Sequence, residues 1–258
     1  MLIAGRNAMM VKPNAPVGEF WGLTFTANEP NVTVNMSKTG SPDAVSLEYC
    51  LGSSDYTDDS NWNAFDADGG TTPITLTNAD DKIYFRAGSS GNTRFSNNTS
   101  NYRNFTFSGS VGASGNIMSL LTKNESDWQS VQMMDNCFCG IFYGCTSLTT
   151  APALPATTLA TYCYYSMFRG CTSLTTAPAL PATTLRDYCY RSMFASCTSL
   201  SSVEVAFTAW NPSNATTNWL FGVASNGKFI CPAALGTYST IARDVSNCPS
   251  GWTVINND

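Results

Sequence analysis

Histidine is absent from the 258-residue chain, and this absence excludes a large part of enzyme chemistry. Ser-His-Asp and Cys-His catalytic systems, HExxH zinc sites and histidine general bases all require an imidazole. A glycosidase needs only two carboxylates about 5 to 10 Å apart. Glu125 with Asp127, or Asp58 with Asp66, are loose candidates for that role. The sequence therefore favours a protein that is not an enzyme and that needs no cofactor.

Charged residues are also scarce, because Asp, Glu, Lys and Arg together make up only 12% of the chain, about half the usual share. The formal net charge is -5, and no stretch of the sequence gathers lysines and arginines. Nucleic acids and anionic membranes attract basic clusters of that kind. We therefore expect neither nucleic acid nor a membrane as a partner.

Long hydrophobic runs are the third absence, since no apolar stretch reaches the roughly 18 residues that span a bilayer as a helix. Near the N-terminus, Arg6 and Lys12 interrupt the apolar residues, so no signal peptide is recognised. Residues 1–18 contain Pro and Gly and show neither helical nor strand periodicity. We interpret them as an attachment arm that is ordered against a partner or a sister subunit. The alternative is a disordered terminus.

Residues 19–112 carry the signals of an antiparallel β-sandwich. Six short segments show alternation or are rich in aromatic residues, and clusters of turn residues separate them. Trp21 and Trp62 are the expected core anchors. The expected strands lie within FWGLTFTA (20–27), VTVNM (32–36), SLEYCL (46–51), PITL (73–76), KIYFRAG (82–88) and NFTFSG (104–109).

Five aspartates in residues 55–68 raise the question of a Ca²⁺ site. Calcium sites need several oxygen ligands converging from a glycine-containing loop, and DADGG (66–70) has this composition. The spacing nevertheless fits no EF-hand loop, and Asp-Gly pairs are ordinary in turns. The interpretation as turns is favoured, so no metal site is predicted.

A repeat of 26 residues dominates the second half of the chain. Residues 145–170 read CTSLTTAPALPATTLATYCYYSMFRG, and residues 171–196 differ from them at only five positions. A degenerate copy precedes them, and a further copy begins at Cys197. Self-similarity at a fixed period is typical of a solenoid, in which each repeat packs only against its neighbours. We predict a junction and N-terminal cap over 113–134, a repeat array over 135–205 and a C-terminal cap over 206–258.

The two halves of one repeat have different patterns. Leu148, Ala151 and Leu154 are spaced three apart in a segment with prolines, which predicts extended backbone with little strand pairing. Over 159–168, apolar and small residues at i, i+3, i+4, i+7 and i+8 predict a short helix with one buried side. The predicted fold class is therefore mainly β with a short-helix repeat region, in which an antiparallel sandwich precedes a capped solenoid.

The chain has ten cysteines, and most of them follow the 26-residue period. Stacked repeats would place the cysteine of one repeat above the equivalent cysteine of the next, so we expect buried, free thiols. A zinc site would need CxxC pairs or histidines, and only one C-x-C pair comes close. Disulfides between columns remain the alternative. The two columns are Cys137, Cys163 and Cys189, and Cys145, Cys171 and Cys197.

The cadence FxGCTSLT, followed by AxxLP and a segment ending MFxxC, resembles that of BspA-like leucine-rich repeats. These repeats are found on gut anaerobes and in fibre proteins of their phages, including crAss-like phages. The resemblance covers residues 133–205, and residues 218–235 are similar to the cap of such arrays. It implies a leucine-rich-repeat fold with a role in adhesion or recognition and no catalytic residues. Two features depart from the family pattern, namely the longer period and the prolines in the strand.

The differences between the two full repeats indicate where a partner would bind. Tyr and Arg are favoured at contact surfaces because they combine a large area with directed hydrogen bonds. The predicted ligand-binding residues are therefore Tyr165, Arg169, Arg186, Asp187 and Arg191. Neutral drift of solvent-exposed positions is the alternative. The differing pairs are Ala160 and Arg186, Thr161 and Asp187, Tyr165 and Arg191, Arg169 and Ala195, and Gly170 and Ser196.

These features predict a phage virion fibre or decoration protein whose repeats bind the host surface or glycans. The arm would dock into capsid or other virion proteins. Residues 1–12 contain six large apolar side chains and only two charges, so they need cover. Sister subunits of a homo-oligomer, preferably a trimer, would supply that cover. The alternative is a bacterial cell-surface adhesin whose export signal has been removed.

Overall fold

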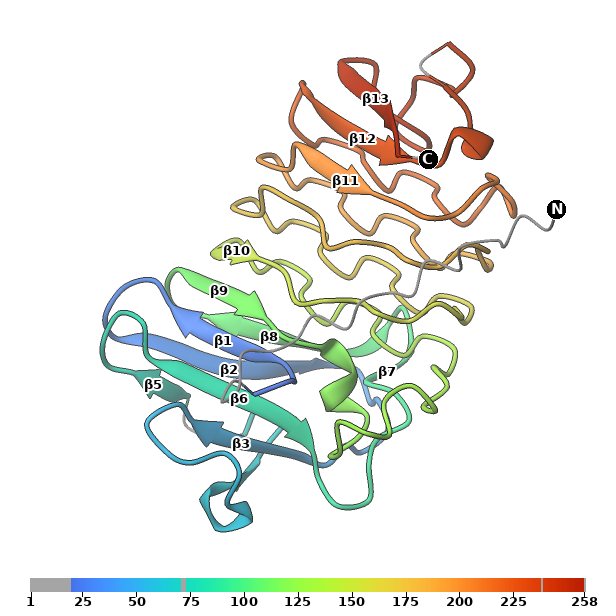
Figure 1. The fold of residues 1–258 in the computed structure, drawn as a ribbon. Coiled ribbons are helices and arrows are strands. Elements are labelled where there is room, and N and C mark those ends of the chain that lie inside the picture. Colours follow the sequence, from blue (N-terminus) through green and yellow to red (C-terminus); the bar gives the residue numbers. More distant parts are fainter. Residues whose placement is uncertain (1–19, 71–72, 238, 258) are drawn as a thin grey trace, which may run out of the picture.

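The computed structural model describes residues 20–70, 73–237 and 239–257, so the predicted arm lies outside the described residues. Within them the chain is mainly β, with 13 strands in three sheets and three short 3-10 helices. Figure 1 shows the N-terminal sheets at one end and the 26-residue repeats stacked on them in succession. No helix in the described part is both long and apolar enough to cross a membrane.

The N-terminal region forms two mainly antiparallel sheets, and each of the six predicted segments contains a strand or most of one. Three further strands are too short, at three or four residues, to show in the sequence pattern. In the first sheet the order β9-β1-β6-β3-β4 joins β1 (Thr24–Ala27), β3 (Leu47–Leu51), β4 (Asn63–Phe65), β6 (Lys82–Ala87) and β9 (Val111–Ser114). In the second the order β5-β2-β8-β7 joins β2 (Val32–Thr39), β5 (Ile74–Leu76), β7 (Ser96–Asn98) and β8 (Asn101–Phe107).

Aromatic rings pack the two sheets against each other. Phe25 of β1 and Phe85 of β6 lie edge to face against Phe105 of β8, with ring centroids 4.8 and 5.2 Å away. All three side chains are fully buried, and burying one contributes about 1.5 to 3 kcal/mol. Of the two predicted core anchors, Trp62 is buried and Trp21 is half buried.

Each repeat contributes a ribbon of consecutive turns where a helix is predicted over 159–168. Alternate N–H groups donate to the carbonyl three residues back, as Cys163 N does to Ala160 O at 3.3 Å. The N–H groups between them donate to the following repeat, as Tyr164 N does to Cys189 O at 3.1 Å. We call these segments turn ribbons; they are residues 136–145, 162–171, 188–197 and 214–222.

The backbone conformation explains why the helix prediction is wrong. Every fourth residue of a turn ribbon is left-handed, as at Tyr162 (φ 58°), Ser166 (φ 51°) and Gly170 (φ 79°). A right-handed helix cannot continue through such residues. The ribbon also buries Tyr164 and Phe168, which lie outside the apolar stripe of the predicted helix.

Aromatic side chains at equivalent positions stack in two columns through the turn ribbons. Adjacent rings lie 5.3 to 6.3 Å apart and are inclined by at most 25°. The first ring of each column belongs to the N-terminal region, so sheets and repeats share one core. One column is Phe105, Phe142, Phe168 and Phe194, and the other is Phe95, Phe138, Tyr164, Tyr190 and Trp219.

The other half of each repeat is extended and sparsely paired, which confirms the prediction for the proline-containing segment. In the middle of the array only isolated bridges occur, such as Thr176 with Ser202. At its C-terminal end the pairing is regular and parallel, and residues 25 or 26 apart in sequence face each other between the last three strands. At the N-terminal end the parallel pairing is interrupted by a register shift between Leu148 and Thr150. These strands are β10 (Leu148–Thr150), beside β9, and β11 (Ser202–Glu204), β12 (Gly227–Cys231) and β13 (Trp252–Asn256).

Three 3-10 helices complete the fold. The second, η2 (Ile117–Leu120), begins the junction, and Ile117, Leu120 and Leu121 are buried there. The other two are η1 (Asp59–Asn61) and η3 (Ala233–Leu235).

All ten cysteines are buried and free, as the column pattern predicts. In the second column, the thiols of Cys171 and Cys197 donate to the carbonyls of Phe142 and Phe168 over 3.1 and 2.9 Å. Burial raises the pKa of Cys197 to about 12. These thiols are therefore neutral packing groups at neutral pH.

Candidate interaction surface

In each repeat, the residue just before the turn ribbon and two residues within the ribbon form a set that recurs every four residues. Nearly all of them directly precede a left-handed residue, and most are exposed or half buried. Cys139 and Ala195 are the buried exceptions. We call the set the outer grid; its rows are Asp135, Cys139 and Tyr143, then Thr161, Tyr165 and Arg169, then Asp187, Arg191 and Ala195, then Ser213, Thr217 and Phe221.

The differences between the two full repeats coincide with the outer grid. Three of the five differing pairs occupy grid positions, and the other two adjoin them. The stacked core residues are identical, as with Phe168 and Phe194. Substitution is therefore confined to side chains that are free of the stacking constraint.

Arginine and tyrosine side chains pack together across this face. The guanidinium carbon of Arg169 lies 5.9 Å from the ring centroid of Tyr143, which belongs to the preceding repeat. The guanidinium of Arg191 lies 5.3 Å from the ring centroid of Tyr188. Both are cation–π arrangements, which hold the cation in place without consuming all of its N–H donors.

A cluster of tyrosines adjoins the arginines. The rings of Tyr162 and Tyr188 stack 4.5 Å apart and 17° from parallel, and Tyr165 lies 5.5 Å from Tyr162. Burial raises the pKa of Tyr162, and the neighbouring Tyr188 adds to the effect. Tyr143, which contacts Arg169, is 39% exposed. The face therefore offers both rings and cations to a partner.

The structure brings two of the predicted binding residues, Tyr165 and Arg191, into this cluster, and places a third, Arg169, against Tyr143. Arg186 and Asp187 lie exposed at the start of the third turn ribbon, where the Asp187 carbonyl accepts a hydrogen bond from Tyr162 N.

The sequence pattern misses Tyr143, Tyr162 and Tyr188. Two of them are identical between the repeats, so they do not stand out as differences. Tyr143 could have been found from the sequence, because it aligns with Arg169 at a spacing of 26 residues.

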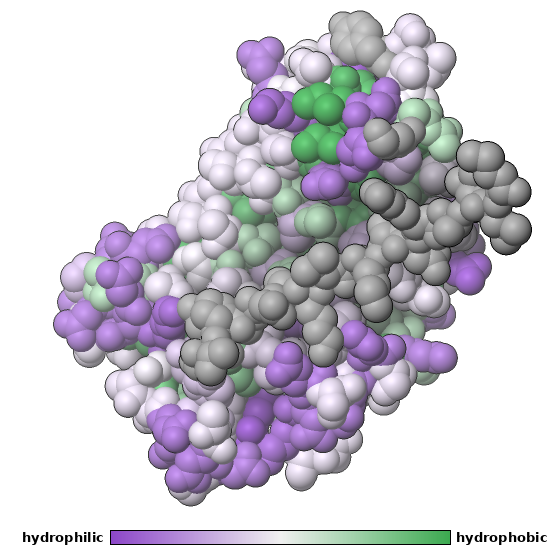
Figure 2. All heavy atoms as spheres, viewed as in Figure 1, coloured by the Kyte–Doolittle hydropathy of each residue, from purple (hydrophilic) through white to green (hydrophobic). Residues whose placement is uncertain are grey.

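The arginines of the repeats form no ion pair within the described residues, whereas Arg86, Arg94 and Arg103 all do. The printed sequence places Arg169, Arg186 and Arg191 in a stretch with few acids. Asp187 is the one acid in the two full repeats that carry them, so these repeats have a net positive formal charge. In Figure 2 the N-terminal sheets carry most of the strongly hydrophilic surface seen from this side, and the repeats are less polar.

The aspartates of residues 55–68 are engaged in turns and ion pairs. Asp55 accepts from Thr57 N and Asp58 from Ser60 N, both at 2.9 Å. Hydrogen bonds from Lys123 and then Arg86 lower the pKa of Asp59. No group of three His, Cys, Asp or Glu side chains placed to hold a metal ion occurs in the described part of the chain. The contacts favour the interpretation as turns.

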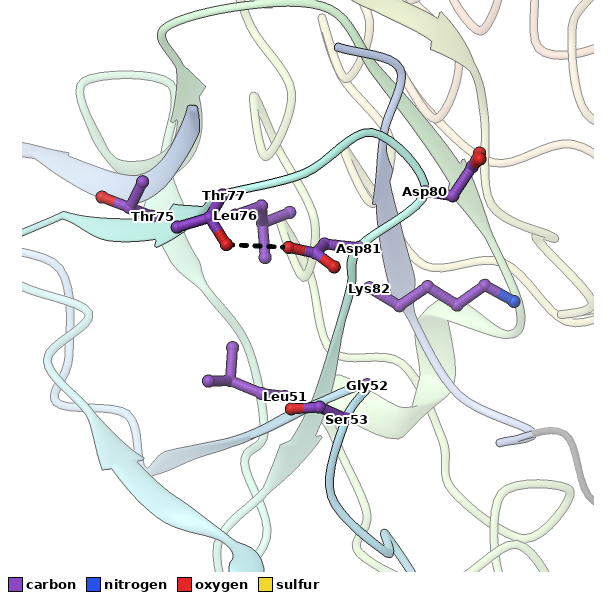
Figure 3. A pocket seen from close by; sticks show the side chains of 9 residues that line it. All are labelled: Leu51, Gly52, Ser53, Thr75, Leu76, Thr77, Asp80, Asp81 and Lys82. Atoms are coloured by element: carbon purple, nitrogen blue, oxygen red, sulfur yellow. Dashed lines mark hydrogen bonds between the residues drawn. The ribbon is translucent and has the colours of Figure 1, made fainter. Parts of the chain in front are cut away.

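A pocket of about 310 Å³ in the N-terminal region is the second candidate (Figure 3). It lies where β3 ends, beside β5 and the start of β6. Asp81 accepts hydrogen bonds from the Thr77 hydroxyl at 3.2 Å and from Asn78 N at 2.9 Å, and the latter lowers its pKa most. In Figure 3 the Lys82 side chain extends away from Asp81. The hydrogen bonds of Asp81 thus stabilise the turn between β5 and β6.

Comparison of the chain with protein-family models, with curated proteins and with solved structures found no match in any of the three.

Proposed function

We propose that this chain is a non-enzymatic structural and recognition protein, a phage virion fibre or decoration protein that binds the host surface or glycans. Its architecture in this proposal is an antiparallel β-sandwich followed by a capped leucine-rich-repeat solenoid of the BspA-like type. The motif FxGCTSLT and the contacts between residues 25 or 26 apart support the solenoid. Its location would be the virion.

The observation that carries the recognition role is the placement of the differences between repeats. A repeat scaffold with an identical core and varied outward side chains can change its partner without changing its packing. The varied residues include Tyr165, Arg169 and Arg191, and these residue types are enriched in binding hot spots. Neutral drift would not by itself produce a face of packed tyrosines and arginines.

Attachment assays with a double variant test the recognition role. Arg186→Ala with Arg191→Ala should weaken attachment to host cells or their isolated glycans and leave the melting temperature unchanged. Thr183→Ala with Thr184→Ala is the matched control, because both threonines are exposed outside the outer grid. Unchanged attachment by the arginine variant would assign the grid to neutral surface.

The N-terminal arm is proposed to join the protein to the particle and to its sister subunits in a homo-oligomer, preferably a trimer. The support is the apolar composition of residues 1–12, which calls for a covering partner. Deleting residues 1–18 should abolish incorporation into particles and reduce the mass measured by light scattering. A truncated protein that assembles and incorporates normally contradicts this part of the proposal.

The second candidate, a bacterial cell-surface adhesin, shares the recognition face and differs in location. Gold-labelled antibody against the repeats separates the two by electron microscopy. Label on purified particles supports the virion, and label on uninfected cells supports the adhesin.

A further inference from the structure

We infer that the outer grid binds an acidic polysaccharide, whose sulfate or carboxylate groups are held by Arg169, Arg186 and Arg191. The inference rests on the proposed recognition function and adds the chemical class of the ligand. It follows from where the charges lie, from how the guanidinium groups are held and from the repetition of the face.

The charges of the chain are divided unevenly between its two regions. Residues 20–112 contain ten acids and five basic residues, so the net negative charge is concentrated in the sheets. The array over 135–205 contains three arginines and three acids, Asp135, Asp187 and Glu204, so it carries no net formal charge. Its two full repeats (145–196) hold all three arginines with one acid, Asp187. All three arginines lie on or beside the outer grid. The two full repeats are therefore the part of this acidic protein with a net positive formal charge, which favours binding of anions there.

The guanidinium groups of the grid remain free to bind an oxyanion. In the sheet region, Arg86 donates to Glu48 and Asp59 at 2.8 and 2.9 Å, so its charge is already balanced. Arg169 and Arg191 are held by the faces of tyrosine rings instead. Stacking occupies the flat face of a guanidinium and leaves its N–H edges for a sulfate or carboxylate.

The tyrosines supply the second kind of contact that a polysaccharide uses. Tyr143 is 39% exposed and Tyr165 is half buried, so both offer ring surface and a hydroxyl beside the arginines. An amphipathic ring of this kind packs against the apolar face of a sugar and hydrogen-bonds to its hydroxyls. The combination fits a charged sugar better than an isolated small anion.

The repetition of the face favours a polymer. Successive turn ribbons are joined by backbone hydrogen bonds, so grid rows recur at about 4.8 Å, the spacing of hydrogen-bonded chains. A linear chain of acidic sugars can engage several rows at once, and each added contact raises its affinity.

Binding of four polymers to the full chain tests the inference. The probes are dextran sulfate, polygalacturonate, neutral dextran of matched length and an oligothymidylate. We expect dextran sulfate, polygalacturonate or both to bind roughly tenfold or more tightly than neutral dextran, with affinity falling as NaCl rises. The acidic polymer that binds identifies the group as sulfate or carboxylate. Equal binding of neutral dextran, tighter binding of the oligothymidylate, or no binding of either acidic polymer overturns the inference.

A charge-matched pair of variants separates the grid from net charge. Arg169→Gln, Arg186→Gln and Arg191→Gln together should reduce acidic-polymer binding roughly tenfold or more. Lys82→Gln, Arg94→Gln and Lys228→Gln remove the same charge elsewhere and should leave it nearly unchanged. Equal losses in both triple variants overturn the inference. If a melting curve shows that the first variant fails to fold, Arg186→Gln alone replaces it, because this side chain is exposed.

Host attachment measured in parallel separates this inference from the proposed function. Wild-type attachment that depends on Arg186 and Arg191, without binding of either acidic polymer, contradicts the polysaccharide class and supports recognition. If the wild type does not attach, or if substitutions in the outer grid leave attachment unchanged, the proposed function itself is contradicted.

Discussion

The rings of Phe168 and Phe194 lie within 1° of parallel, with centroids 5.6 Å apart. The two residues are 26 apart in sequence, and both are fully buried. The period of the sequence is thus a period of contact between identical side chains. Each repeat packs against the next repeat through the same residues with which the previous repeat packs against it. A change at a core position therefore requires a matching change in the neighbouring repeats.

Removing one ring should therefore destabilise the whole array. Phe168→Ala leaves a cavity between Phe142 and Phe194, and we expect the free energy of unfolding to fall by about 3 to 5 kcal/mol. Urea denaturation followed by tryptophan fluorescence measures it. Thr158→Ala, at an exposed position, is the control and should change stability by less than about 0.5 kcal/mol. A loss below about 1 kcal/mol for the ring would contradict the role assigned to the stack.

Burial should make the thiols unreactive until the protein unfolds. Treating the native protein with a thiol reagent at pH 8 is expected to label almost none of the ten cysteines, and adding denaturant should label nearly all. Mass spectrometry counts the modified residues. Rapid labelling of several cysteines in the native state, or few free thiols after unfolding, would refute the buried, reduced columns.

The same thiols should weaken the protein at alkaline pH. Burial raises the pKa of Cys189 to about 11 and of Cys197 to about 12, whereas an unfolded thiol titrates near pH 8.5. The stabilisation is complete below the unfolded pKa and is lost as pH rises toward the folded value, by about 1.4 kcal/mol per thiol and pH unit. Urea midpoints at pH 8, 9 and 10 test this. Cys189→Ala should show a shallower decline, and an unchanged slope would argue against the assignment.

The pairing of Asp68 with Arg103 should weaken in acid. The Arg103 side chain is only 1% exposed, and the Asp68 carboxylate lies 2.5 Å from its guanidinium. Hydrogen bonds from Lys38 first and Arg103 second lower the pKa of Asp68. This contribution is present above the ordinary carboxyl pKa, near 3.9, and is lost as pH falls through the lowered folded value.

Asp68→Asn should cost about 1 to 3 kcal/mol at pH 7, because a buried guanidinium loses its charged partner. It should also flatten the loss of stability below about pH 4. Asp80→Asn is the control, since this residue is exposed and asparagine tolerates its left-handed backbone (φ 68°). Thermal melts from pH 7 to pH 3 compare the two. Equal effects would contradict a special role for Asp68.

Much of the fold could be predicted from local patterns. Alternation and aromatic content locate strands such as β2 and β6, and the period locates the thiol columns. The turn ribbons could not be predicted in this way, because a turn that recurs every four residues buries nearly the same positions as a helix. The left-handed residues that distinguish them include Tyr162 and Ser166, which sequence rules do not expect there. Only the glycines at some of these positions, Gly140, Gly144, Gly170 and Gly222, give a hint.

The candidate surface could be located in part. The differing positions of the two repeats identify Tyr165, Arg169 and Arg191, because freedom to vary follows from facing outward. The contact of Arg169 with Tyr143 joins different repeats, so it depends on stacking that one repeat does not reveal.

The hydrogen bonds between turn ribbons allow the length of the array to change only by whole repeats. Phe142 N donates to Met167 O and Phe168 N to Met193 O, so a whole 26-residue unit inserted after Gly170 would meet the same donors and acceptors on both sides. Such an insertion moves β13 about 4.8 Å further from the N-terminal sheets and adds one row of three outward positions. An insertion that is not a whole number of 26-residue units disrupts the alternation of donors. The length of the array and the number of rows in the outer grid therefore increase together, by one fixed amount for each added repeat.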